Sequence, residues 1–196
     1  MFGIFLKLGI HHILNYEAYD HILFVTLLTI GYRPRQWKIV LALVTAFTLG
    51  HTASLAIATL GYLSIQRSLV EWMIVITILI TAVENIITGE KEGHHAFSLK
   101  YWLKYALAML FGLIHGLGFA SYLQALLGRE GHVLVPLLSF NIGVELGQWV
   151  VVVIIMCLTF MLVMLFHMKI RMWNQVVSTI GIVISLILLV TRFPWK

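Results

Sequence analysis

Long apolar runs, separated by short connections, dominate this chain of 196 residues. A helix needs about 20 mainly apolar residues to cross a bilayer. The runs therefore predict an all-α fold, a polytopic bundle of six transmembrane helices in a single integral membrane domain over residues 1–196. The predicted helices cover about residues 18–31, 38–63, 69–88, 101–127, 137–167 and 173–191.

Two of the runs are irregular. Polar residues at Asn15–Glu17 and at Asp20–His21 interrupt the first run, so we expect a short outer segment followed by a helix that starts near Glu17. The fifth run exceeds one membrane thickness, and its start at 133–140 contains Pro136. We expect that start to be a loop or a helix outside the core.

The composition excludes a sizeable soluble domain. Hydrophobic residues make up 61% of the chain and charged residues 11%, against about 25% charged in an average soluble domain. The net charge of +5 resides in short connections between apolar runs, which is typical of helix ends anchored at a membrane surface. We therefore predict membrane lipid as a partner and no nucleic acid. The sequence does not identify a protein partner.

The positions of the basic residues predict an orientation. The connections after the first, third and fifth helices hold eight Lys and Arg residues, and the opposite side holds five. Because cytoplasmic connections are enriched in Lys and Arg, both termini are predicted to lie outside the cell membrane.

Two short matches suggest an internal duplication. Residues 46–50 resemble residues 139–143, which lie 93 positions later. The segment that starts at His21 resembles the one that starts at His115, 94 positions later. Three helices per copy would make the second copy inverted, giving a 3+3 inverted repeat of the kind found in transporters.

Ionisable side chains lie inside the apolar runs, where each costs at least about 2.5–3.5 kcal/mol if it faces lipid. In the predicted orientation, most of them fall in the outer half of the membrane, so we expect them to share one polar pocket. The candidate metal ligands are His21, His51, His115 and Glu145, with Asp20 beside His21. Candidate supporting or pathway residues are Asn141, Gln148, Thr48 and, nearer the inner side, Glu84.

The polar stripe on the fifth helix permits two interpretations. Asn141, Glu145 and Gln148 follow at i, i+4 and i+7, so a helix places them on one face. They could bind a ligand, or they could form a hydrogen-bonding seam between helices. The carboxylate favours a ligand, because Asn and Gln could form a seam at lower cost.

The donor atoms indicate the class of metal. Imidazole and carboxylate ligands without thiolates suit nickel, cobalt, zinc or iron(II), whereas soft sulfur ligands select copper(I). The same residues could hold a catalytic zinc, with Glu145 or Asp20 as general base in an intramembrane hydrolase. A third possibility is a structural or sensing subunit whose polar cluster only joins helices.

Four segments, at residues 12–24, 46–52, 111–120 and 140–148, together resemble the HupE/UreJ family. The resemblance implies a bacterial inner-membrane carrier or channel for a divalent metal such as nickel, with His12, Asp20, His21 and His115 at matching positions. Phe111 and Gly118 stand where the nickel permeases of the family carry His and Glu, which indicates a divergent branch. We therefore predict a transition-metal transporter or channel, for Ni²⁺ or a similar divalent cation including Zn²⁺, in preference to an enzyme.

Overall fold

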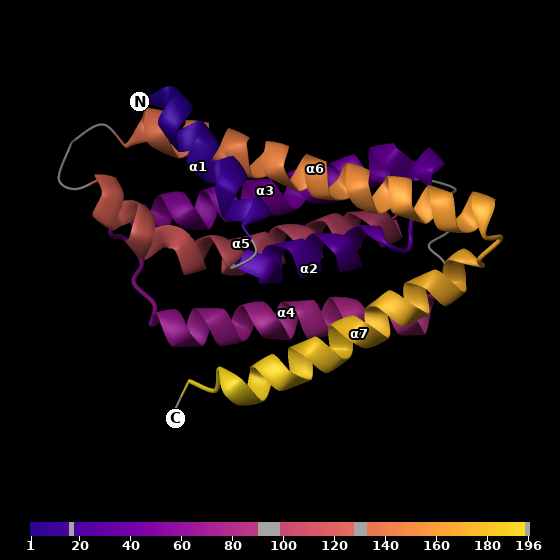
Figure 1. Cartoon of the computed structure of the whole chain (residues 1–196). Helices are drawn as coiled ribbons and strands as arrows, with labels where there is room; N and C mark the ends of the chain where they lie inside the picture. The colour runs from indigo at the N-terminus through magenta and orange to yellow at the C-terminus, as the bar shows by residue number, and fades with distance from the viewer. Residues whose placement is uncertain (16–17, 90–98, 128–132, 195–196) are drawn as a thin grey trace.

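The computed structural model describes residues 1–15, 18–89, 99–127 and 133–194, and these residues contain helices and no strand (Figure 1). The helices in chain order are α1 (Phe2–Leu14), α2 (Tyr19–Thr29), a short 3-10 turn η2 (Pro34–Gln36), α3 (Trp37–Thr59), α4 (Arg67–Thr88), α5 (Leu99–Leu127), α6 (Leu134–Leu165) and α7 (Ile170–Thr191). Both termini lie at the same end of the bundle, which we call the terminus end (Figure 1). The predicted all-α helix bundle is confirmed.

Five of the helices, α3 to α7, are long and apolar enough to cross a membrane. The first predicted helix is interrupted, as expected, and forms the two shorter helices α1 and α2. At 1.5 Å per residue, the 13 residues of α1 and the 11 residues of α2 span about 20 and 17 Å, and neither alone covers a hydrocarbon core of about 30 Å. Asn15, with an extended backbone, ends α1 and begins the break.

Two helix boundaries differ from the prediction for identifiable reasons. The start of the fifth run belongs to α6, because a proline in the first turn of a helix loses no helical hydrogen bond. The expectation of a loop or an external helix there was wrong. In addition, α3 ends at Thr59, before the predicted residue 63, because Gly61 adopts a positive φ of 83° that terminates the helix.

Glycines bring α3 and α5 into backbone contact. A methyl group added at Gly112 would collide with the carbonyl oxygen of Phe47, and one added at Gly50 would collide with the carbonyl oxygen of Met109. Only helices without side chains at these positions can approach so closely.

An equivalent contact joins α1 and α6. A methyl group at Gly9 would collide with the carbonyl oxygen of Phe140, and one at Gly143 would collide with that of Leu6. In both helix pairs, residues later in one helix contact residues later in the other, so the two helices of each pair are parallel. The α1–α6 pair runs away from the terminus end and the α3–α5 pair runs toward it (Figure 1).

The two helix pairs are related as in an inverted repeat. Gly50 and Phe47 of α3 correspond to Gly143 and Phe140 of α6, which is the predicted spacing of 93 positions. Gly112 of α5 corresponds to Gly9 of α1, a spacing of 103 positions. This second spacing differs from the predicted 94, and it pairs His115 with His12 instead of His21. The short sequence match at His21 was therefore misleading, because three-residue matches arise easily in apolar helices.

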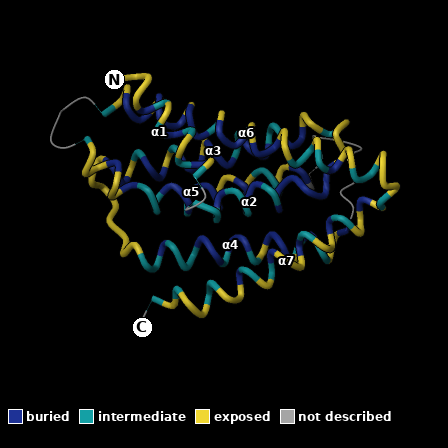
Figure 2. Tube along the Cα trace, in the orientation of Figure 1, coloured by how far each residue is buried: buried dark blue, intermediate teal, exposed yellow. Residues whose placement is uncertain are grey.

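Two buried asparagines connect α7 and α2 to α4. The amide of Asn174 donates to the carbonyl oxygens of Asn85 and Gly89, at 3.1 and 2.9 Å. The amide of Asn85 in turn donates to the carbonyl oxygen of Leu27, at 2.7 Å. The outer faces of α6 and α7 remain exposed and apolar, as expected of surfaces that face lipid (Figure 2).

Candidate metal site

Four histidines from four helices meet inside the bundle. His12 lies in the last turn of α1, His21 lies in the first turn of α2, and His51 and His115 lie within α3 and α5. The ring centroids of His12 and His21 are 4.8 Å apart, and those of His21 and His115 are 5.1 Å apart. One ligand nitrogen from each of His12, His21 and His51 lies within 4.8 Å of the others. We call these four residues the histidine cluster.

The Nε2 atoms of the cluster have no hydrogen-bond partner among the described residues. All four Nε2 atoms are buried. Buried polar atoms in proteins are nearly always paired, so an unpaired group of four requires an explanation. Coordination of a metal ion would satisfy these nitrogen atoms.

Three of the rings are held through their other nitrogen. The Nδ1 atom of His21 lies 3.2 Å from Oδ1 of Asp20, and that of His51 lies 3.4 Å from Oδ1 of Asn141. The Nδ1 atom of His115 lies 2.8 Å from the carbonyl oxygen of Phe111. If Nδ1–H donates to these oxygens, each neutral ring presents the lone pair of Nε2 to the cluster. Metal-binding histidines in proteins are oriented in this way.

The local structure of each helix explains the convergence. The break after α1 lets His12 and His21, nine positions apart, both reach the cluster. The close contact of Gly116 with the carbonyl oxygen of His51 brings the histidines of α3 and α5 together. Asp20 lies in the first turn of α2, where a carboxylate is stabilised by the helix dipole, and it accepts a hydrogen bond from the backbone N–H of His21 at 3.0 Å.

A cavity of about 440 Å³ leads from the terminus end to the cluster and is lined by His12, His21 and His115. We call it the entrance cavity. Charged pairs surround it: Arg67 contacts Glu71 at 2.8 Å, and Arg192 lies 3.7 Å from Asp20. The cavity gives a hydrated ion a route to the imidazoles.

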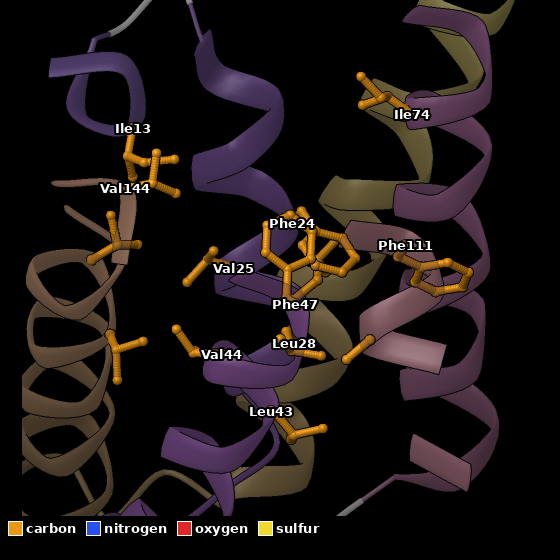
Figure 3. Packing of buried hydrophobic residues seen from close by; sticks show 14 of the residues in the cluster. Ile13, Phe24, Val25, Leu28, Leu43, Val44, Phe47, Ile74, Phe111 and Val144 are labelled. Atoms are coloured by element: carbon orange, nitrogen blue, oxygen red, sulfur yellow. The ribbon is translucent and has the colours of Figure 1, made fainter. Parts of the chain in front are cut away.

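Aromatic rings close the opposite side of the cluster. The ring centroids of Phe24 and Phe47 each lie 5.0 Å from that of His115, and the two phenylalanines are 4.9 Å apart (Figure 3). Phe111 contacts the ring of Phe24 at 6.0 Å. We call Phe24, Phe47 and Phe111 the phenylalanine layer. It separates the cluster from the other end of the bundle.

Sequence reasoning did not identify the phenylalanine layer. A signal was present, because each phenylalanine lies three or four positions from a histidine of the cluster on the same helix. Residues at that spacing share one helix face.

The other predicted residues lie along the contact of α3 with α6. Thr45 donates to a carboxylate oxygen of Glu145 and Thr48 donates to the side-chain oxygen of Gln148, both at 2.8 Å. Asn141, one turn before Glu145, is the residue that reaches the histidine cluster. The polar stripe of α6 therefore contains one direct contact to the cluster and a seam of hydrogen bonds to α3.

Glu84 lies away from the histidine cluster. Its carboxylate forms a salt bridge of 3.0 Å with Lys104, beside a small cavity that includes Tyr32 and Leu43. The structure thus brings together His12, Asp20, His21, His51, His115 and Asn141, places Thr48, Glu145 and Gln148 in the adjoining seam, and separates Glu84 from both.

Comparison with protein families finds a match to the family described as HupE / UreJ protein, over residues 1–194. No curated protein and no solved structure matches the chain. The match covers nearly the whole chain, so the protein belongs to this family, in agreement with the predicted resemblance. Its family and its long apolar helices together identify it as a multi-pass membrane protein. The family implies transport of metals of the nickel and cobalt type.

Proposed function

We propose that this HupE/UreJ family member carries a divalent transition-metal ion, with Ni²⁺ as the leading candidate, and that the histidine cluster binds the ion during transport. The observation that carries the proposal is twofold. His12, His21 and His51 each bring one ligand nitrogen within 4.8 Å of the others, and the Nε2 atoms of these three residues and of the neighbouring His115 are buried without partners among the described residues. Imidazole nitrogens suit nickel, cobalt and zinc, and the described part of the site offers no thiolate that would select copper(I).

The surroundings suit a cation that binds and then leaves. Four neutral imidazoles leave the charge of a divalent ion intact, and the carboxylate of Asp20 behind His21 offsets part of it. Arg192 also contacts Asp20, so this compensation is partial. A resident structural metal would be served better by anionic ligands than by this arrangement.

The access routes suggest the transport cycle. The cluster connects with the entrance cavity on one side, and the phenylalanine layer lies on the other. The geometry is that of a carrier open toward the terminus end. Release at the other end requires the phenylalanine layer to move, and the polar seam that includes Glu145 offers the next oxygen ligands along α6.

The excess of basic residues at the opposite end of the bundle supports placing that end in the cytoplasm. In the inner membrane of a bacterium, the entrance cavity would then face the periplasm, and the cycle would import the metal. The termini would lie in the periplasm.

The hydrolase alternative receives no specific support. A zinc hydrolase keeps one ligand position for water and a general base beside it. In this structure Asp20 contacts His21 and Arg192, and Glu145 accepts a hydrogen bond from Thr45. These contacts single out neither carboxylate as that base.

The test compares two adjacent histidines. Purified protein in liposomes is assayed for uptake of radioactive Ni²⁺, Co²⁺ and Zn²⁺, and metal binding is measured by calorimetry. We expect His12→Ala to weaken binding by more than the 10- to 100-fold that loss of a group supporting a ligand costs, and to abolish uptake. The matched control is His11→Ala, which alters an exposed histidine next to it that lines the entrance cavity outside the cluster and should retain equilibrium binding.

A further variant distinguishes binding of the metal ion from its transport through the protein. Glu145→Gln should slow uptake while equilibrium binding stays close to that of the wild type, because Glu145 contacts Thr45 and lies outside the cluster. Equal uptake by His12→Ala and wild-type protein would reject the proposal. Bound metal without any uptake would instead support the hydrolase.

A further inference from the structure

A second cavity, of about 920 Å³, lies at the end of the bundle opposite the termini. The connection between α2 and α3 forms one side of it and the turn between α6 and α7 forms the other. Its basic lining residues are Arg33, Arg35, His167, Lys169 and Arg171. We call it the basic cavity.

No acidic side chain of the described residues lines the basic cavity. The acidic side chains of the described residues are engaged elsewhere: Asp20 contacts His21, Glu71 contacts Arg67, Glu84 contacts Lys104, and Glu145 contacts Thr45. Arg33 has a further interaction of its own, and Arg35, Lys169 and Arg171 bring three more positive charges to the same space. Like charges gathered in one cavity attract an anion.

The wall between the basic groups is apolar and faces outward. Phe160 and Met164 of α6 line the cavity and are 52% and 59% exposed. The ligand should therefore carry an anionic group and an apolar part.

Tryptophans place the cavity at the level of the membrane surface. Trp37, which is 50% exposed, follows the α2–α3 connection, and Lys38 lies 5.8 Å from its ring. The indole N–H of Trp173 donates to the hydroxyl of Thr159, a residue of the cavity wall, at 3.1 Å. Tryptophan is enriched at the level of lipid headgroups.

We propose that the basic cavity binds an anionic phospholipid, with the phosphate between the guanidinium groups of Arg35 and Arg171 and the acyl chains along Phe160 and Met164. Guanidinium groups match the geometry of phosphate oxygens. Basic pockets between transmembrane helices are suited to anionic headgroups, and lipid is the anion present at this depth. This site is separate from the histidine cluster, so the proposal does not depend on the metal.

The test is native mass spectrometry of the full chain, purified in detergent and titrated with short-chain phosphatidylglycerol, phosphatidylcholine or inorganic phosphate. We expect phosphatidylglycerol to bind more tightly than phosphatidylcholine, and inorganic phosphate not to displace it. The double variant Arg35→Gln/Arg171→Gln should weaken lipid binding by about 25-fold, at about fivefold for each charge near the surface. The matched control is Lys38→Gln, which removes a nearby exposed charge that does not line the cavity and should retain the affinity.

A charge-preserving variant is the control for misfolding. Arg35→Lys/Arg171→Lys should keep most of the affinity and the thermal midpoint of the wild type. Equal affinity of the glutamine double variant and the wild type, or equal loss in Lys38→Gln, would overturn the proposal. So would displacement of the lipid by inorganic phosphate, which would indicate a site for the free anion. A mutation that changes the fraction of dimer and not the lipid adducts would indicate a second copy of the chain at this face, and would also overturn it.

Discussion

Replacing Gly112 by alanine should separate the two helices that carry His51 and His115. The added methyl group would collide with the carbonyl oxygen of Phe47 and would lie 2.9 Å from its carbonyl carbon and 3.0 Å from the backbone nitrogen of His51. Ordinary contact begins at 3.4 Å, and the obstructing atoms are backbone, so α3 must withdraw as a unit. No side-chain rotation can absorb the clash.

The magnitude follows from this displacement. Inserting a methyl group into a packed interior costs about 1–3 kcal/mol. For soluble chains of 150–250 residues, each kcal/mol lowers the thermal midpoint by about 2–4 °C. The required shift also exceeds the tolerance of about 0.2 Å on metal–ligand distances, so affinity for Ni²⁺ should fall together with stability.

The assay is thermal unfolding in detergent, with and without Ni²⁺, combined with calorimetric measurement of nickel affinity. The control for stability is Gly118→Ala on the same helix, where the added methyl group meets only the ends of two side chains, Ile74 at 3.3 Å and Val70 at 3.8 Å. That variant should unfold near the wild-type temperature or above it, because alanine favours helix over glycine by about 1 kcal/mol. Identical midpoints and nickel affinities for Gly112→Ala and wild-type protein would refute the account of the α3–α5 contact.

Three further predictions concern the site and the frame around it. Asn141→Leu removes the group that holds the ring of His51 and should lower metal affinity about 10- to 100-fold in calorimetry, with a smaller change in the thermal midpoint; an unchanged affinity would exclude that role. Metal binding should weaken as pH is lowered from about 7.5 to about 5, because a protonated imidazole has no lone pair at Nε2, and a constant affinity over this range would exclude histidine ligands. Asn174→Leu removes the hydrogen bonds to Asn85 and Gly89 and leaves buried acceptors unpaired, so the free energy of unfolding should fall by about 1–3 kcal/mol, whereas nickel affinity should change little. A full loss of binding in that variant would show that α7 controls the cluster.

The helical type and the five long apolar helices could be predicted because a bilayer imposes one length and one polarity on every crossing, whereas the first of the six predicted transmembrane helices corresponds to two shorter helices. The same rule flagged the histidines, since an ionisable group in an apolar run must find a partner. The start of α6 was predicted less well, because hydropathy alone does not show that Pro136 lies in a first turn.

The partners of each polar residue could not be predicted. The sequence placed Glu145 among the ligands, and the structure pairs it with Thr45, because the rotation of α6 about its axis depends on the glycine contacts with α1. The equivalence of His12 and His115 in the inverted repeat could not be predicted for a similar reason. The correspondence of α1 with α5 depends on the backbone contacts at Gly9 and Gly112, and the side chains around these two glycines differ.

By itself, the sequence determined that this chain is a membrane helix bundle of the HupE/UreJ family with imidazoles buried in its crossings, because solvation by lipid constrains length and polarity residue by residue. Only the tertiary structure decided which imidazoles meet, which nitrogen each presents, and which side of the cluster is open. Those properties depend on how the helices are rotated and how closely they approach, and these are set by contacts between residues about a hundred positions apart in the chain.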